Sequence, residues 1–167
     1  MANSKPIGVA YADPALESGT TLSAAALSEN NLFGGENEQV LGGTIATTGN
    51  SDTFIIAPVS GVVSAIIFSG TDALAASDTN FITFSVTNLG QAGAGSTAVL
   101  AATDANTTKV TGGTALSANT RRNLTLNGTA ANLVVVRGDR LRVRAAATGT
   151  LANTVTFPVY AFAFATA

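Results

Sequence analysis

The chain has 167 residues, of which half are Ala, Thr, Gly or Ser, while charged residues make up only 11% and the formal net charge is −2. It has no His and no Cys, which excludes disulfides, zinc sites built from Cys and His, and every mechanism that uses an imidazole base or a thiolate nucleophile. With 46% apolar residues and little charge, the composition is that of a folded domain, and the length favours a single one.

Residues 1–40 differ from the rest and are expected to form an extended N-terminal arm. This segment contains five acidic residues and one lysine, which gives it a net charge of −4. Its large apolar residues do not alternate with a sustained period of two. We expect these residues to contact a partner or a neighbouring subunit; they are Ile7, Val9, Tyr11, Leu22, Leu27, Leu32 and Phe33. A disordered tail or a further strand of the same domain is the alternative. Because neither a secretory signal nor a membrane span is recognisable, we expect synthesis in the cytoplasm and no membrane contact.

Residues 41–167 predict an all-β domain. Runs rich in Val, Ile, Phe and Thr recur between turn residues. The expected strands are 43–48, 53–57, 61–69, 81–87, 108–111, 123–126, 133–137, 140–147 and 154–164. Strands at this spacing, without helical periodicity, indicate a sandwich or a barrel.

Periodicity predicts which faces of these strands are buried. In 81–87, Ile82, Phe84 and Val86 project to one side, and mostly Thr and Ser project to the other. Four apolar runs lack this alternation: Ile55-Ile56, Val62-Val63, Ile66-Ile67 and Val134-Val135-Val136. We therefore expect those strands to be covered on both faces, either at the centre of the sandwich or at a subunit interface.

Six of the eight cations lie within residues 121–144. Alternation in 140–144 places Leu141 and Val143 inward. Arg140, Arg142 and Arg144 then project outward, and we call them the arginine ladder. We expect a basic contact face for an acidic protein surface, such as the arm; its residues are Arg121, Arg122, Arg140, Arg142 and Arg144. Nucleic acid is disfavoured as a partner, because the cluster holds no aromatic residue and the isoelectric point is about 4.9. A solvated strand face is the remaining interpretation.

The last strand carries three aromatic residues on one face, Tyr160, Phe162 and Phe164. They either close the core or form the centre of a subunit interface, where the intervening alanines would allow close approach.

Weaker motifs have simpler explanations. The tripeptide Arg137-Gly138-Asp139 matches the integrin-binding sequence, but Gly-Asp between two strands is typical of a tight hairpin turn. The acids of the β domain lie in settings typical of turns, so we expect no catalytic residues, no enzymatic activity, no metal and no cofactor. A calcium site formed by Asp72, Asp78 and Asn80 is the alternative for the loops.

Four runs carry a resemblance to a known family. They are FIIAPVSGVV at 54–63, SGTDALAA at 69–76, FITFSV at 81–86 and RGDRLRV at 137–143. Together they resemble the small jelly-roll decoration, or cement, proteins of tailed bacteriophage capsids, over residues 43–164. Such proteins share no catalytic residues that could be carried over to this chain.

The resemblance implies a fold, a location and partners. The fold would be an antiparallel jelly-roll-like β-sandwich with an extended N-terminal arm. The protein would form a homotrimer on the outer capsid surface of the virion, after synthesis in the host cytoplasm, and would clamp neighbouring subunits of the major capsid protein. A phage fibre or a receptor- or glycan-binding module with the same sandwich is the alternative.

Overall fold

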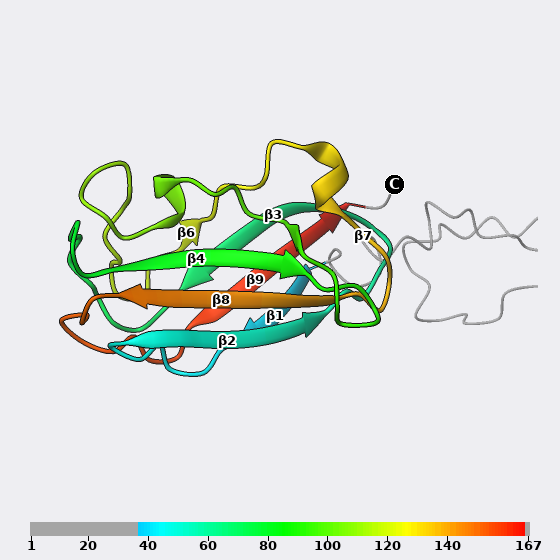
Figure 1. Cartoon of the computed structure of the whole chain (residues 1–167). Coiled ribbons are helices and arrows are strands. Elements are labelled where there is room, and N and C mark those ends of the chain that lie inside the picture. Colours follow the sequence, from blue (N-terminus) through cyan, green and yellow to red (C-terminus); the bar gives the residue numbers. More distant parts are fainter. Residues whose placement is uncertain (1–36, 166–167) are drawn as a thin grey trace, which may run out of the picture. The chain divides into compact units, whose positions relative to one another are not determined.

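The computed structural model describes residues 37–165 of the chain (Figure 1). This part of the chain is all β, and its only helical elements are two short 3₁₀ turns, η2 (Asp104–Asn106) and η3 (Ala130–Leu133). The strands are β1 (Asn37–Leu41), β2 (Gly49–Ile56), β3 (Gly61–Ser69), β4 (Phe81–Asn88), β5 (Thr97–Ala98), β6 (Arg122–Asn123), β7 (Val134–Val135), β8 (Arg140–Thr148) and β9 (Val159–Ala165). Within these residues, no helix has the length and apolar character needed to cross a membrane.

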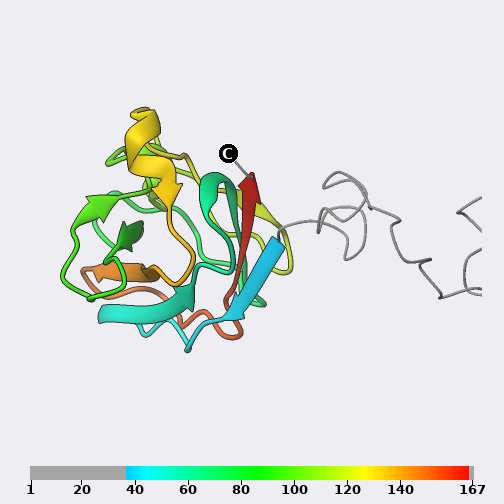
Figure 2. The same cartoon turned by 90° about the vertical axis from the view of Figure 1, so that its right-hand side faces the viewer.

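The strands form two antiparallel sheets. The first has the order β1-β9-β3-β6, with β7 also paired to β3, and the second has the order β2-β8-β4-β5. With the short β7 set aside, this is the strand order of a jelly roll, in which the chain passes repeatedly from one sheet to the other. Seen from one end, β1 and β9 lie on one side of the fold and β2 and β8 on the other (Figure 2). The expected all-β, jelly-roll-like sandwich is confirmed.

The core lies between the two sheets and follows from strand alternation. In β4, Ile82, Phe84 and Val86 are at most 2% exposed, as the period of two predicts. The Phe84 ring lies 4.8 Å from the ring of Phe68 on β3, so this contact joins the two sheets. Next to Phe84 in register on β8 is Ala145, which is fully buried and leaves room for the ring. Burial stabilises the fold by about 1.5–3 kcal/mol for each large apolar side chain.

The structure differs from the predicted strands at several places. Only Arg122–Asn123 and Val134–Val135 are strands in the neighbourhood of 123–126 and 133–137, and β5 was not predicted. Residues 43–48 and 154–158 contribute only an isolated bridge between Ile45 and Val155, and β9 begins at Val159, directly after Pro158, which has no N–H to donate. Residues 108–111 are not a strand, because side chains take up the backbone donors there: Thr107 Oγ1 accepts from Lys109 N, and Asp78 Oδ1 accepts from Thr111 N. β1 begins at Asn37, inside the range predicted as the arm.

The predicted hairpin at Arg137-Gly138-Asp139 is wrong, although the turn is present. β7 pairs with β3 whereas β8 pairs with β2 and β4, so residues 136–139 connect the two sheets. Gly138 has a φ of 92°, which favours glycine. Asp139 is only 8% exposed, and its Oδ2 accepts hydrogen bonds from Val136 N and from Asn88 Nδ2, both at 2.9 Å. Because its carboxylate holds the turn from inside, Asp139 is not presented to solvent as an integrin ligand would be.

Replacing Asp139 with Ala is expected to destabilise the protein by about 1–3 kcal/mol, because two donors then lose their acceptor in a partly buried setting. Urea unfolding would measure this loss. Asp139→Asn keeps one acceptor oxygen and should lose less. An Ala variant as stable as the wild type would contradict this function of the carboxylate.

Candidate functional site

The arginine ladder of β8 lies on the outer face of the second sheet. Leu141 and Val143 are at most 1% exposed, which confirms the alternation on which the ladder was predicted. Arg144 is paired with Asp52 on β2 through two hydrogen bonds, Nε to Oδ1 at 2.6 Å and Nη2 to Oδ2 at 2.7 Å. These bonds hold the pKa of Asp52 below its usual value and raise that of Arg144.

The other two arginines of the ladder have no carboxylate partner among residues 37–165. The Arg140 guanidinium lies 4.1 Å from the centroid of the Phe54 ring, which is 41% exposed. Arg142 is the register partner of Phe54, and its Nε is buried without a hydrogen-bond partner in the described part of the chain. This face therefore offers cationic groups beside an aromatic ring.

Arg122 does not belong to the contact face predicted for it. Its guanidinium donates hydrogen bonds to three loop carbonyls, those of Ala105 at 2.8 Å, Thr107 at 2.6 Å and Thr114 at 2.9 Å, and lies 5.5 Å from the ring centroid of Phe84. Burial lowers its pKa. The neighbouring Arg121 is exposed and directly precedes β6, which belongs to a different sheet from β8. The five predicted arginines therefore do not lie on one face, because β6 and β8 belong to different sheets.

Tyr160, Phe162 and Phe164 are at most 5% exposed and lie in the core. The ring of Tyr160 packs 5.4 Å from Phe68, and Phe162 stacks on Phe164 at 6.1 Å. The interpretation that these three rings close the core is confirmed. The interpretation that they pack against another subunit is wrong, because the same sandwich already covers them. Burial also raises the pKa of Tyr160.

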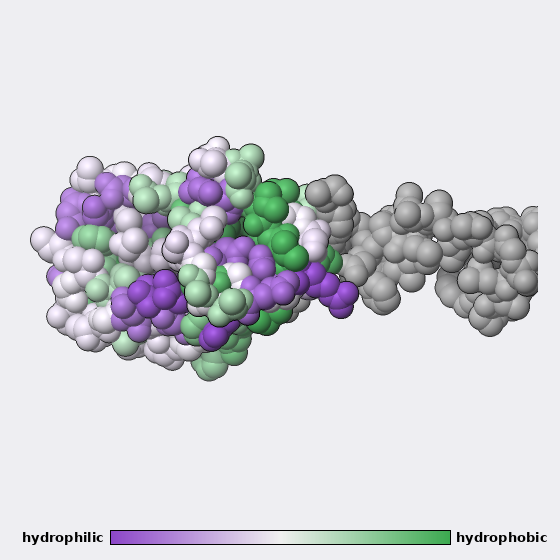
Figure 3. All heavy atoms as spheres, turned by 45° about the vertical axis from the view of Figure 1, so that its right-hand side comes forward, coloured by the Kyte–Doolittle hydropathy of each residue, from purple (hydrophilic) through white to green (hydrophobic). Residues whose placement is uncertain are grey.

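Exposed aliphatic side chains flank the connection between the two sheets. Here residues 57–60 lie beside residues 136–139, joined by hydrogen bonds from Gly138 N to Ala57 O at 2.9 Å and from Ala57 N to Asp139 O at 2.8 Å. We call this end of the sandwich the turn end. It is flanked by Ile56, Val134 and Val136, which are 56%, 50% and 52% exposed. Figure 3 shows apolar side chains beside hydrophilic ones over this part of the surface.

These aliphatics belong to two of the four runs whose lack of alternation predicted cover on both faces. Ile55 and Val135 are buried, at 5% and 1% exposed, whereas their neighbours are open on the outer side. On β3, Val63 and Ile66 are buried, while Val62 and Ile67 are half-buried. For Ile56, Val134 and Val136 the centre of the sandwich is wrong, and a subunit or partner interface stays a prediction.

The loop acids act as hydrogen-bond acceptors for distant backbone amides. Asp72 accepts from Thr156 N at 2.7 Å, and Asp78 from Thr111 N at 2.9 Å. Asn80 accepts from Thr150 N at 3.2 Å. The three proposed calcium ligands thus hold three different loops, and no cluster of three acidic side chains occurs in the described residues.

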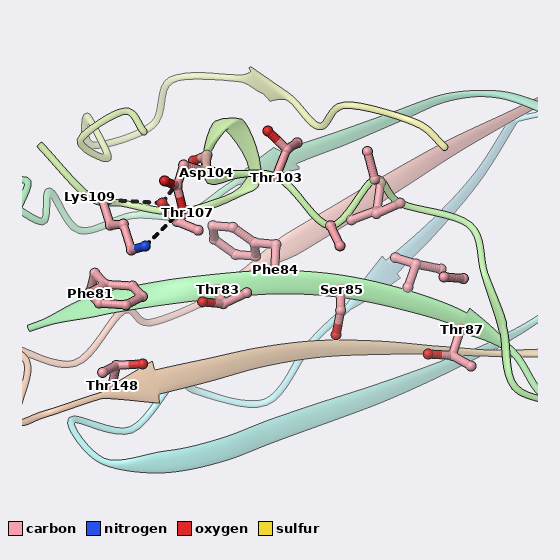
Figure 4. A pocket seen from close by; sticks show the side chains of 15 residues that line it. Phe81, Thr83, Phe84, Ser85, Thr87, Thr103, Asp104, Thr107, Lys109 and Thr148 are labelled. Atoms are coloured by element: carbon pink, nitrogen blue, oxygen red, sulfur yellow. Dashed lines mark hydrogen bonds and ion pairs between the residues drawn. The ribbon is translucent and has the colours of Figure 1, made fainter. Parts of the chain in front are cut away.

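A groove with a volume of about 570 Å³ runs along β4, and the sequence did not reveal it (Figure 4). The outward side chains of β4 form one side and the segment 98–109, which contains η2, forms the other. No periodic signal marks this segment, so only the folded chain places it across from β4. The predicted arm residues Ile7, Val9, Tyr11, Leu22, Leu27, Leu32 and Phe33 lie outside the described residues.

Arg122→Ala is expected to destabilise the protein by about 1–3 kcal/mol, because three loop carbonyls lose a charged donor. The adjacent Arg121→Ala is the matched control, and a change at this exposed position should stay within about 0.5 kcal/mol. Chemical denaturation measures both. Equal effects of the two variants would contradict the structural function of Arg122.

Stability is expected to be constant between pH 7 and about pH 5 and to fall below about pH 4. Hydrogen bonds lower the pKa of Asp72 and of Asp78, and the Arg144 pair lowers that of Asp52. A carboxyl group whose pKa is lowered by folding stabilises the folded state at every pH above its unfolded-state pKa. This contribution is lost as the pH falls through the folded-state pKa. Thermal melting across this range tests it, with Asp72→Asn expected to flatten the acid limb. Because the chain has no His, a loss of stability near pH 6 would contradict this assignment.

No family model, no curated protein and no solved structure matches the chain.

Proposed function

We propose that the protein is a structural virion protein that binds the outer surface of a tailed-phage capsid and clamps neighbouring major capsid subunits. The observation that carries the proposal is the turn end, where half-exposed aliphatic side chains lie uncovered beside cations. The jelly-roll strand order supports it as well, because it is the fold that the family resemblance implies.

The turn end has the composition of a protein contact surface. Covering Ile56, Val134 and Val136 removes apolar area from water, worth about 25 cal/mol for each Å². Arg137 and Arg140, both exposed, belong to the same connection between β7 and β8. Arginines around an aliphatic centre are typical of protein interfaces and favour an acidic partner surface.

Clamping needs more than one attachment point. A homotrimer would present three turn ends, and linked weak contacts raise the overall affinity far above that of one contact. The N-terminal residues 1–36, which carry four acids and one lysine, would contact the shell or a sister subunit in this proposal. The residues for that contact are the apolar ones predicted for the arm.

Co-sedimentation with empty capsids of the phage that encodes the chain tests the proposal. Wild-type protein should pellet with the capsids, and Val134→Asp combined with Val136→Asp should weaken binding by about tenfold or more, because charge replaces apolar contact. Val110→Asp is the matched control, since Val110 is 64% exposed but lies in the loop after Lys109, outside the turn end.

Two further measurements belong to the same test. Light scattering should give a trimer, and deletion of residues 1–36, which leaves β1 complete, should weaken capsid binding. Monomeric protein that does not pellet with capsids would overturn the proposal. Wild-type binding by the double Asp variant would overturn the assignment of the turn end.

A further inference from the structure

We propose that the groove along β4 is a binding site for a neutral oligosaccharide. The site lies on a different part of the molecule from the turn end, and the proposal does not depend on capsid attachment. Its volume of about 570 Å³ falls within the usual range of small-ligand sites, about 300–1,000 Å³.

The groove presents a row of free hydroxyl groups. Thr83, Ser85 and Thr87 project outward from alternate positions of β4, and Thr148 on β8 lies beside Phe81, its register partner (Figure 4). None of these four hydroxyls has a hydrogen-bond partner among the side chains and backbone groups of the described residues. A hydroxyl both donates and accepts, as the hydroxyls of a sugar also do, so the two kinds of group are complementary.

The charged residues of the groove neutralise each other. Among the described residues that line it, only Asp104 and Lys109 are charged, and Lys109 Nζ bonds to Asp104 Oδ1 at 2.8 Å. Arg144 and Arg142 on β8 are the register partners of Ser85 and Thr87 on the same outer face, but they do not line the groove. Oδ2 of Asp104 stays available as an acceptor, because none of the described residues bonds to it. A site without net charge favours a neutral ligand over an anion or a cation.

The groove also has an aromatic surface. The half-buried Phe81 ring stands at one end, with Lys109 Nζ 4.9 Å from its centroid. The electron-rich face of an aromatic ring attracts polarised C–H groups, such as those on one face of a sugar ring. An aromatic ring next to hydroxyls and a carboxylate therefore matches the two surfaces of a carbohydrate.

A peptide strand fits this groove less well. At Ile82 the edge of β4 is covered by Thr108, whose N donates to Ile82 O at 2.9 Å, and at Val86 it is covered by Val99, whose N donates to Val86 O at 2.8 Å. Since the backbone groups of a strand alternate in direction, only the peptide groups of Phe84 lack such a cover on this edge, and Phe84 is 2% exposed. One nearly buried residue is too short an edge for strand addition.

Titration of the ¹⁵N-labelled full chain, followed by its amide spectrum, tests the proposal. The probes are maltohexaose, cellohexaose, mannohexaose and the neutral chitin hexasaccharide, together with an uncharged hexapeptide of alternating Val and Thr. At least one sugar should shift the amides of 81–87 and 103–109 in a saturable way. No shift with any of the four sugars, or shifts in the groove with the peptide alone, would overturn the proposal.

Variants locate the binding within the chain. Phe81→Ala should weaken the binding by about tenfold through loss of the aromatic contact, and Ser85→Leu should abolish it by filling the groove. The matched control is Phe157→Ala, because Phe157 is 65% exposed and does not line the groove. Unchanged amides away from the groove show that each variant is folded. Loss of binding in Phe157→Ala, with full binding in Phe81→Ala, would place the sugar elsewhere and overturn the assignment.

Discussion

The contact between Phe68 and Phe84 across the two sheets is the constraint on which the rest of the fold depends. The ring of Tyr160 extends this contact along β9, and the small Ala145 beside Phe84 makes space for it. Because side chains alternate along a strand, placing these rings inward decides the direction of the other side chains on β4, β8 and β9. On β3 the alternation shifts at a bulge between Val63 and Ala65. The arginine ladder and the hydroxyl row point outward for this one reason.

Each carboxylate whose side chain the structure describes has a definite function in the fold. Every acid whose side chain the structure describes accepts a hydrogen bond: Asp52 from Arg144, Asp72 from Thr156, Asp78 from Thr111, Asp104 from Lys109 and Asp139 from Val136. Arg122 holds the loop over Phe84 in the same manner. Long loops lack ladder hydrogen bonds, so polar side chains supply the partners that their backbone groups need. The carboxylates of the described residues are thus used for the fold, while the charges left for contact are positive.

Two of the surfaces that these contacts leave open differ in chemistry. The turn end combines aliphatic side chains with arginines, which suits a large protein surface that is acidic. The groove along β4 combines hydroxyls, one aromatic ring and a neutralised ion pair, which suits a small polar ligand. A jelly roll can carry both, because its ends are built from turns and its faces from strands. Capsid attachment through one surface would leave the other free for a second ligand.

The sequence by itself determined the elements that rest on local patterns. Alternation in 81–87 and 140–147 predicted β4 and β8 with their correct buried faces. Tertiary structure decided what depends on contacts between distant residues. Arg122 and Arg142 look alike in the sequence, but β6 and β8 belong to different sheets, so one holds a loop and the other faces outward. Likewise, whether Phe162 meets a sister subunit or its own core is decided by which sheet packs over β9, and no local pattern contains that information.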